Sequence, residues 1–210
     1  RVNSIILQQR KIKSEEEMKE IRAAQAITDK AFIHMLDMIK PGLCEKDLQL
    51  ELDYFMLKNG ATGLAFETIL AAGANGSMPH AVPSMNVIKE GDFVTMDFGA
   101  AHNGYCSDMT RTVAVGKISE EQEKVYNLVL NAQLAAIDAV KAGVPCNSID
   151  AVARDMIYGA GYEGRFGHGL GHSLGLEIHE NPRFSPLCSE LTEAGIVMSV
   201  EPGIYLDGQF

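Results

Sequence analysis

Two aspartates, Asp97 and Asp108, stand on opposite arms of a predicted β-hairpin. Asn103-Gly104 predicts a two-residue turn between the arms, because both residue types tolerate the positive φ angles that such a turn requires. Counting back from the turn places Asp97 opposite Thr110, and side chains two residues apart on one strand share a face. We therefore expect the two carboxylates to be diagonal neighbours, about 7–8 Å apart at the backbone.

Two carboxylates on one face of a sheet repel each other, and burying them without a partner is costly. A cation bound between them removes both problems, whereas solvent exposure of one or both side chains is the ordinary alternative. Asp97 lies within the apolar run 93–98, which favours the buried arrangement. The pair therefore indicates a metal site, with the exposed arrangement still open.

Three of the six histidines, His168, His172 and His179, fall within the glycine-rich segment 166–182. A His-x-x-x-His pair on a helix suggests metal binding, but the glycines beside His168 and His172 disfavour a helix. We predict an extended, tightly packed loop in which backbones approach closely. Histidine suits a catalytic site because it can ligate a metal when neutral and transfer protons near neutral pH.

The elements that must position these residues follow from periodicity and turn signals. Two long helices begin at capping boxes, Ser14 with Glu17 and Ser119 with Gln122. The segment between the two pairs of helices is rich in strand-forming residues. The predicted helices cover residues 14–39, 45–59, 119–141 and 148–158, and the strand-rich segment covers residues 67–116.

The order of elements repeats along the chain. Residues 91–99 resemble residues 195–203 at an offset of 104, and the stretch that ends the first long helix recurs at an offset of 101. The same order of matches in both halves predicts a duplicated unit of long helix, short helix and strands. The repeat places Asp97 and Glu201 at equivalent positions.

Bulk composition limits the classes of function. The 210 residues are 46% hydrophobic and 22% charged, as in a globular domain. The net charge of −10 argues against a nucleic-acid binder, and no apolar run reaches the ~18–20 residues that span a membrane. Residues 1–13 lack the charge order and apolar length of a signal peptide. Four cysteines without paired spacing predict reduced thiols in a cytoplasmic protein.

Four motifs contain the candidate metal-binding residues. They are Thr95-Met96-Asp97-Phe98-Gly99, Tyr105-Cys106-Ser107-Asp108-Met109-Thr110-Arg111, the glycine-rich motif of His172, and Ser199-Val200-Glu201-Pro202-Gly203. They occur in the order seen in the pita-bread metallopeptidases, which comprise the methionine aminopeptidases, aminopeptidase P and prolidase, and the chain resembles this family over nearly its whole length. The resemblance implies an α+β pita-bread fold, with pseudo-two-fold duplicated helix–helix–strand units around a curved, mainly antiparallel sheet.

Pro79-His80-Ala81 and the segment 174–180 are most similar to the proline-specific branch, aminopeptidase P and Xaa-Pro dipeptidase. The resemblance implies a metal-dependent exopeptidase that cleaves between an N-terminal residue and proline, in peptides with proline at the second position. It also implies two divalent metal ions, Mn²⁺ first, with Co²⁺ or Zn²⁺ as alternatives. The implied roles are metal binding for Asp97, Asp108, His172 and Glu201, catalysis for His80, His179 and Glu201, and substrate binding for His168.

The resemblance also implies parts outside these 210 residues. The family has a fifth ligand, a bridging glutamate in a Gly-x-Arg-x-Glu motif, which is expected beyond Phe210. We expect residues 1–13 to be a linker that follows an N-terminal domain, and residues 14–210 to be a catalytic domain truncated before its last strand. The chain alone is therefore expected to be weakly active or inactive. No sequence feature sets the oligomeric state, and a homodimer is the assembly considered.

Three rival functions stay open. A methionine aminopeptidase would prefer Met-Gly-x over x-Pro peptides. A pita-bread domain kept as a non-catalytic binding module would hold no metal. A creatinase-like hydrolase of carbon–nitrogen bonds needs no metal. Metal content and substrate preference separate these functions from a proline-specific peptidase.

Overall fold

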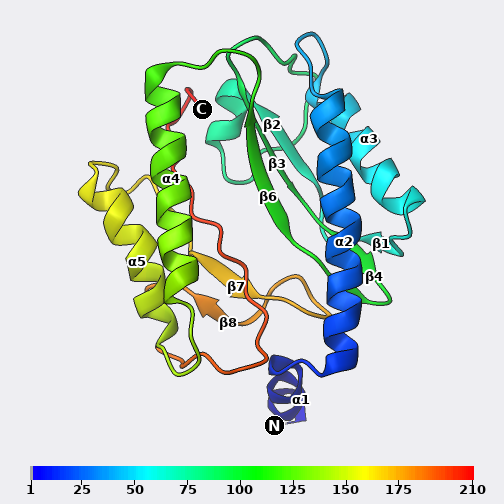
Figure 1. The fold of residues 1–210 in the computed structure, drawn as a ribbon, viewed down its shortest axis with the longest axis vertical. Helices are drawn as coiled ribbons and strands as arrows, with labels where there is room; N and C mark the ends of the chain where they lie inside the picture. Colours follow the sequence, from blue (N-terminus) through cyan, green and yellow to red (C-terminus); the bar gives the residue numbers. More distant parts are fainter. Residues whose placement is uncertain (1) are drawn as a thin grey trace. The chain divides into compact units, whose positions relative to one another are not determined.

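The computed structural model describes residues 2–210, which fold as two compact units. Helices and antiparallel strands occur in both, which confirms the α+β class (Figure 1). We call them the aspartate unit, Lys19–Glu123 with Tyr205–Phe210, and the histidine unit, the chain up to Met18 with Lys124–Ile204.

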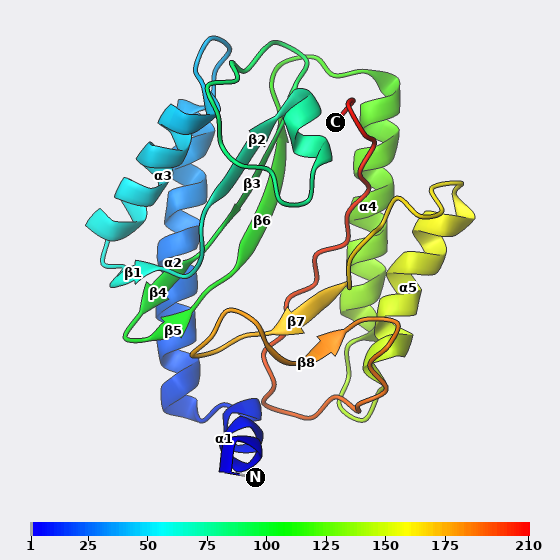
Figure 2. The same cartoon turned by 180° about the vertical axis from the view of Figure 1, so that it is seen from behind.

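Two helices and two antiparallel sheets build the aspartate unit (Figure 2). The helices are α2 (Glu15–Met38), most of which lies in this unit, and α3 (Glu45–Lys58). The main sheet has the order β2-β3-β6 and the smaller sheet the order β1-β4-β5. The strands and the 3-10 turn are β1 (Gly63–Leu64), β2 (Ile69–Ala72), η1 (Gly73–Ser77), β3 (Phe93–Phe98), β4 (Ala100–His102), β5 (Tyr105–Cys106) and β6 (Met109–Ala114).

Strand β3 separates an apolar core from a polar face. Val94, Met96 and Phe98 are fully buried in one cluster with residues of α2 and α3. Each such side chain contributes about 1.5–3 kcal/mol relative to its exposed state. Because side chains alternate along a strand, Thr95 and Asp97 point to the opposite face, where they are half-buried.

The predicted hairpin turn and its register are confirmed. Asn103 and Gly104 have φ angles of 47° and 88°, and His102 pairs with Tyr105. Asp97 pairs with Thr110, as the count from the turn requires. After the turn, the chain forms two separate strands, β5 and β6, with a break between them.

The break in the hairpin follows from a close backbone approach at Gly99. A Cβ on this residue would lie 2.1 Å from the carbonyl oxygen of Ser107, so only glycine fits. The Ser107 side chain also bonds the Thr28 hydroxyl at 2.6 Å and accepts from the Ala100 amide at 2.9 Å. Asp108 therefore lies in the gap between β5 and β6, outside both strands.

Three helices and a two-stranded sheet form the histidine unit. Its apolar core joins α4, α5 and β8. The fourth helix, predicted from about Ser148, begins at Cys146, and the Ser148 hydroxyl bonds the Pro145 carbonyl at 2.7 Å inside the first turn. The elements are α1 (Val2–Lys11), α4 (Glu120–Ala139, which begins in the aspartate unit), α5 (Cys146–Gly159), β7 (Gly171–Ser173) and β8 (Glu180–Phe184).

The duplication predicted from sequence is confirmed by matching backbone hydrogen bonds. The Glu45 amide donates to Asn86 O at 3.1 Å, and the Cys146 amide donates to Glu190 O at 2.8 Å. Asp97 pairs with Ile69 in the aspartate unit, and the Glu201 amide donates to Leu170 O in the histidine unit. These partners are related by the same offsets of 101 and 104 that the sequence shows.

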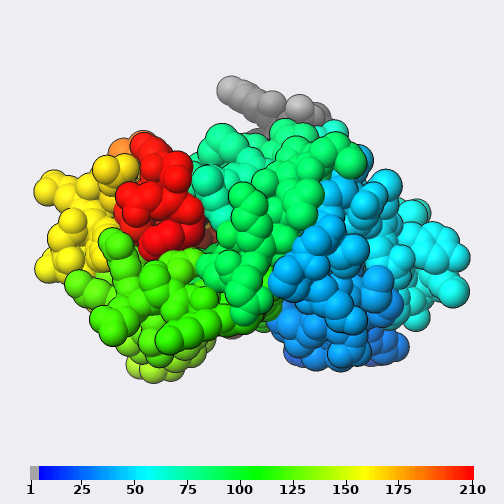
Figure 3. All heavy atoms as spheres, turned by 90° about the horizontal axis from the view of Figure 1, so that it is seen from above, coloured from blue at the N-terminus to red at the C-terminus, as the bar shows by residue number. Residues whose placement is uncertain are grey.

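The chain's C-terminal residues pack on the aspartate unit. The Gly208 amide donates to Ser77 Oγ at 3.1 Å, and the rings of Phe210 and Phe93 meet edge to face. Figure 3 shows this end of the chain, in red, at the surface. Within residues 2–210, none of the helices is both long and apolar enough to cross a membrane.

Candidate metal centre

Asp97 lies on the polar face of the main sheet in the aspartate unit. It sits between Ile69 of β2 and Thr110 of β6. On the same face, two residues away, the hydroxyls of Thr95 and Thr112 bond each other at 2.9 Å. Asp97 is therefore held on a central strand, on the same face of the sheet as these two hydroxyls.

Asp108 is positioned by the residue before it rather than by a strand ladder. Ser107 is buried, and its amide donates to Ala100 O at 2.9 Å. Together with the Thr28 contact, this fixes the backbone that leads into Asp108, whose side chain is half-buried. The two candidate ligands of this unit thus belong to the same hairpin, one on a strand and one in its break.

His172 and Glu201 form the centre of the histidine unit. His172 Nε2 lies 3.2 Å from Glu201 Oε1. The hydroxyl of Ser199 donates to the same Oε1 at 2.8 Å and accepts from the His172 amide at 3.0 Å. The Ser199 amide donates to His172 O at 2.8 Å, so the two segments also pair through their backbones.

The donor set of this pair fits a divalent cation. His172 Nδ1 lies 3.1 Å from Ser173 O, and a carbonyl at that nitrogen holds the proton there and leaves Nε2 as the ligand atom. Nitrogen and oxygen ligands bind such ions at about 2.0–2.2 Å, so two adjacent ligands of one ion lie about 3 Å apart. The observed spacing matches that requirement.

The carboxylate of Glu201 stays ionised. Burial alone would raise its pKa, but hydrogen bonds from His172 and Ser199 outweigh burial and hold the pKa below the ordinary value of 4.5. A charged carboxylate beside an imidazole nitrogen is the form that a cation requires.

The other histidines singled out by sequence have different surroundings. The ring of His179 meets the ring of His172 edge to face, with centroids 4.5 Å apart. The His168 ring packs edge to face on Phe166 at 5.0 Å. His80 is exposed in the segment after η1 of the aspartate unit. The structure thus places His168, His172, His179 and Glu201 in one unit, and His80, Asp97 and Asp108 in the other.

The glycine-rich histidine segment is extended, as predicted. A Cβ on Gly171 would lie 2.0 Å from Ser199 O, and one on Gly169 would lie 2.8 Å from Phe184 O. These contacts confirm the close backbone approach. Part of the segment is the strand β7, which pairs with β8.

Sequence reasoning missed an ion cluster beside His179. The buried carboxylate of Glu180 accepts from Arg10 Nη2 at 2.5 Å and from Lys13 Nζ at 3.0 Å. In the described part of residues 1–13, residues 2–11 form α1, and Arg10 and Lys13 anchor β8 through Glu180. That this segment is a linker stays a prediction. Ser199 was also missed, although its place two residues before Glu201 on an extended segment predicts a shared face.

The four cysteines of the described residues 2–210 are thiols. Burial raises the pKa of Cys146 to about 12, with a smaller contribution from Cys188. A thiol with such a pKa is protonated at neutral pH and is not a nucleophile.

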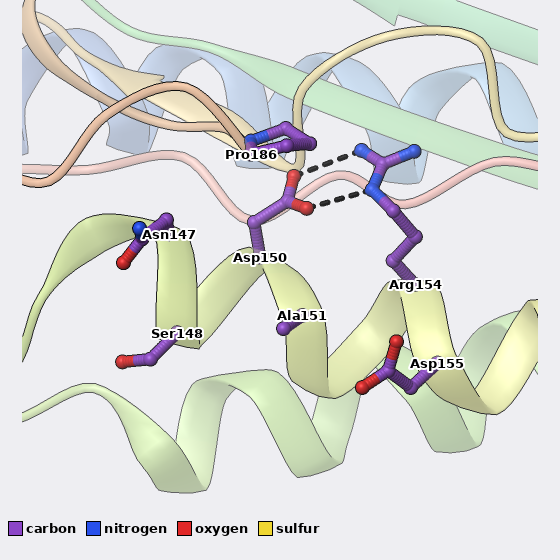
Figure 4. A pocket seen from close by; sticks show the side chains of 7 residues that line it. All are labelled: Asn147, Ser148, Asp150, Ala151, Arg154, Asp155 and Pro186. Carbon is purple, nitrogen blue, oxygen red and sulfur yellow. Dashed lines mark hydrogen bonds and ion pairs between the residues drawn. The ribbon is translucent and has the colours of Figure 1, made fainter.

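A surface hollow runs along α5 (Figure 4). Asp150 and Arg154 lie in it, but they already bond each other at 2.7 and 2.9 Å. Asp155 also lines the hollow and is exposed, so the hollow carries a carboxylate outside this ion pair.

Comparisons with known proteins agree with the motifs. The chain is 45% identical over 197 residues to the uncharacterized peptidase YqhT of Bacillus subtilis, covering 94% of this chain and 56% of that protein. It is 41% identical over 206 residues to the Xaa-Pro dipeptidase of Pyrococcus furiosus, covering 98% of this chain and 59% of that protein. The chain thus spans less than two thirds of the length of these relatives.

Solved structures show the same fold. The X-Pro aminopeptidase of Thermotoga maritima superposes with a TM-score of 0.96 and 42% identity, covering 99% of this chain and 59% of that one. The prolidase of Pyrococcus furiosus gives a TM-score of 0.97 and 40% identity, covering 99% and 62%. The pita-bread expectation is confirmed. Residues 19–210 match metallopeptidase family M24, and the chain belongs to this family.

Proposed function

We propose that the protein containing this chain is a metal-dependent exopeptidase that hydrolyses the bond between an N-terminal residue and proline. The observation that carries the proposal is the His172–Glu201 pair at 3.2 Å, braced by Ser199, in a member of family M24. Relatives named as an Xaa-Pro dipeptidase and an X-Pro aminopeptidase support proline specificity over the methionine-specific alternative.

We propose that Asp97, Asp108, His172 and Glu201 bind two divalent metal ions. Asp97 and Glu201 occupy equivalent places in the duplicated units, which supports a shared role. A set of carboxylates with one imidazole favours Mn²⁺ over a thiolate-type zinc site, with Co²⁺ or Zn²⁺ as alternatives. Such a metal pair supplies Lewis acidity for the scissile carbonyl and activates water near neutral pH.

The chain's own residues hold the ligands and handle protons. Ser199 and the His172 backbone keep the Glu201 carboxylate in one orientation, and its lowered pKa keeps it ionised at neutral pH. In this form Glu201 can accept the proton released when water attacks the scissile carbonyl, and it would pass that proton to the leaving amine as the peptide bond breaks.

His80 and His179 are proposed to donate hydrogen bonds to the substrate carbonyl as it gains negative charge. His179 suits this role because its ring packs directly on His172. His168 is proposed to line the pocket for the peptide. We also propose a cytoplasmic location, which the free cysteines support.

Substrate preference and metal content test the function together. The full-length protein is expected to hydrolyse Ala-Pro or Ala-Pro-Ala faster than Met-Gly-Ala, and to contain metal by plasma mass spectrometry. His172→Ala should lose both metal and turnover. His34→Ala is the matched control, since His34 stacks on Phe55 at 4.2 Å and bonds Glu51, on the other unit's helices.

Preference for Met-Gly-Ala would establish the methionine aminopeptidase instead. A full-length protein without metal and without peptide turnover after Mn²⁺ is added would exclude the exopeptidase and would leave the binding module and the creatinase-like hydrolase. Both results are obtained with the parent protein, so neither can be confused with the loss of activity in the His172→Ala variant.

A further inference from the structure

Asp150 and Arg154 form a bidentate ion pair one turn apart on α5 (Figure 4). Arg154 Nε donates to Asp150 Oδ2 at 2.7 Å, and Nη2 donates to Oδ1 at 2.9 Å. The Asp150 side chain is 1% exposed. The desolvation of a buried pair offsets most of its attraction, so stability alone does not account for charges at this place.

The remaining polar groups of the pair hold the histidine loop, residues 166–170. Arg154 Nη1 donates to Phe166 O at 2.8 Å, and Nη2 donates to His168 O at 2.7 Å. From the other side, the Leu170 amide donates to Asp150 Oδ1 at 3.0 Å. Alternate residues are glycines, whose backbone freedom makes such external restraint necessary.

The same contacts orient the His168 ring. The guanidinium of Arg154 stacks over the Phe166 ring at 4.2 Å, and the Phe166 ring in turn meets the His168 ring edge to face at 5.0 Å. His168 Nδ1 lies 2.8 Å from Gly169 O, inside the restrained loop. A planar, five-donor guanidinium can bond two carbonyls and stack at once, which a lysine ammonium cannot do.

The restraint extends to the metal-binding pair. Leu170 donates its amide to Asp150, and its carbonyl accepts from the Glu201 amide at 2.8 Å. His172 follows two residues later. Asp150 and Arg154 therefore fix the loop on one side while Glu201 fixes it on the other.

The duplicated unit has a weaker version of this arrangement. At the offset of 101, Asp150 and Arg154 correspond to Gln49 and Asp53, which also bond each other. Asp53 accepts one hydrogen bond at 2.6 Å, from Thr68 just before β2. The charged, multiply bonded version occurs in the unit whose loop carries His168 and His172.

We propose that Asp150 and Arg154 are positioning residues that set the His168 ring for substrate binding without touching the substrate. The proposal rests on the substrate-binding role proposed for His168. Two variants of the full-length protein separate positioning from folding. Arg154→Lys keeps the positive charge but loses the planar guanidinium that bonds Asp150 through two nitrogens. The double variant Asp150→Leu with Arg154→Met removes both charges, so neither charge is left buried without a partner.

Both variants are expected to keep the parent's metal content and cooperative unfolding. Their kcat/KM for Ala-Pro is expected to fall about 100-fold, mostly because KM rises. A misplacement of about 1 Å in a site can produce a loss of this size. The His168 Cε1–H resonance, assigned with His168→Gln, should shift or broaden in both. Lys11→Met is the control, because Lys11 belongs to the same unit and its ion pairs are with Glu190 and Glu193. It should leave KM and the resonance unchanged.

A folded double variant with the parent's KM and an unchanged His168 resonance would overturn the proposal. The resonance does not depend on turnover. If the parent protein fails to cleave Ala-Pro, the proposed function fails, while the resonance still decides whether the pair orients His168.

Discussion

Ser199 links the two candidate ligands of the histidine unit through one small side chain. Its hydroxyl donates to Glu201 Oε1 and accepts from the His172 amide. Groups that orient a ligand in this way often matter almost as much as the ligand itself, because they fix its direction and its protonation state.

Ser199→Ala is therefore expected to weaken Mn²⁺ binding by about 10–100-fold while leaving both ligands in place. Calorimetric titration of the metal-stripped full-length protein measures this. Ser148→Ala is the control, since Ser148 is on the surface of α5 and bonds only its own helix turn at Pro145. Equal Mn²⁺ affinity in Ser199→Ala and the parent would show that the hydroxyl has no orienting role.

At the scale of elements, strand β7 and the segment that ends at Glu201 lie so close together that Gly171 has no room for a side chain. A Cβ added to Gly171 would lie 2.0 Å from Ser199 O, and that oxygen belongs to backbone that pairs with His172. A side chain here must push the two ligand-bearing segments apart.

Gly171→Ala is expected to destabilise the protein by about 1–3 kcal/mol or more, the usual cost of overpacking a fixed backbone. Urea unfolding followed by circular dichroism gives the change in the free energy of unfolding. Gly159→Ala, at the end of α5 where a Cβ meets open space, should change it by less than about 1 kcal/mol. Similar values for both variants would contradict the packing argument.

The anchor between residues 10–13 and β8 gives the histidine unit a dependence on pH. Burial alone would raise the pKa of Glu180. Hydrogen bonds from Arg10 and Lys13 lower the pKa by more than burial raises it, so the pKa lies below 4.5. A lowered folded-state pKa contributes stability that is present above the unfolded value and is lost as pH falls through the folded value.

Acid unfolding of the parent should therefore include a loss of stability that begins near pH 4.5 and continues below it. Glu180→Gln should lower stability at pH 7 by about 1.5–3 kcal/mol, the worth of hydrogen bonds to a charged group, and should flatten the curve below pH 4.5. Glu163→Gln, an exposed carboxylate of the same unit, serves as control. If the free energy of unfolding changed with pH in the same way for Glu180→Gln and the parent, Glu180 would not be a source of the acid sensitivity.

Local signals explain which elements were predictable. The capping box of Ser14 and Glu17 forms as expected, with reciprocal bonds of 2.8 and 3.2 Å, and the Asn103-Gly104 turn sets the register of the hairpin. The break before Asp108 was not predictable, because it depends on Ser107 meeting Thr28, 79 positions away. The Lys13–Glu180 contact spans 167 positions and leaves no pattern in either segment.

At the scale of the whole molecule, the two units share one backbone arrangement but differ in many of their side chains. The paired residues Ile69 and Asp97 correspond to Leu170 and Glu201, and both acids emerge from the same place in their unit. Elsewhere the repeats differ, since the buried Glu45 corresponds to Cys146. Duplication thus preserved the backbone and the acids at the candidate centre while other positions diverged.

If the metal ligands come from both units, metal binding must stabilise both. A ligand present at 100 times its Kd adds about 2.7 kcal/mol to the free energy of unfolding, so amides that exchange by unfolding slow by roughly 100-fold. Hydrogen exchange with and without Mn²⁺ on the full-length protein should therefore show slowing in β3 and in β7 alike. Asp97→Asn should reduce the slowing in β7, although it changes only the aspartate unit. Slowing confined to β7 and unaffected by Asp97→Asn would place the metal entirely within the histidine unit.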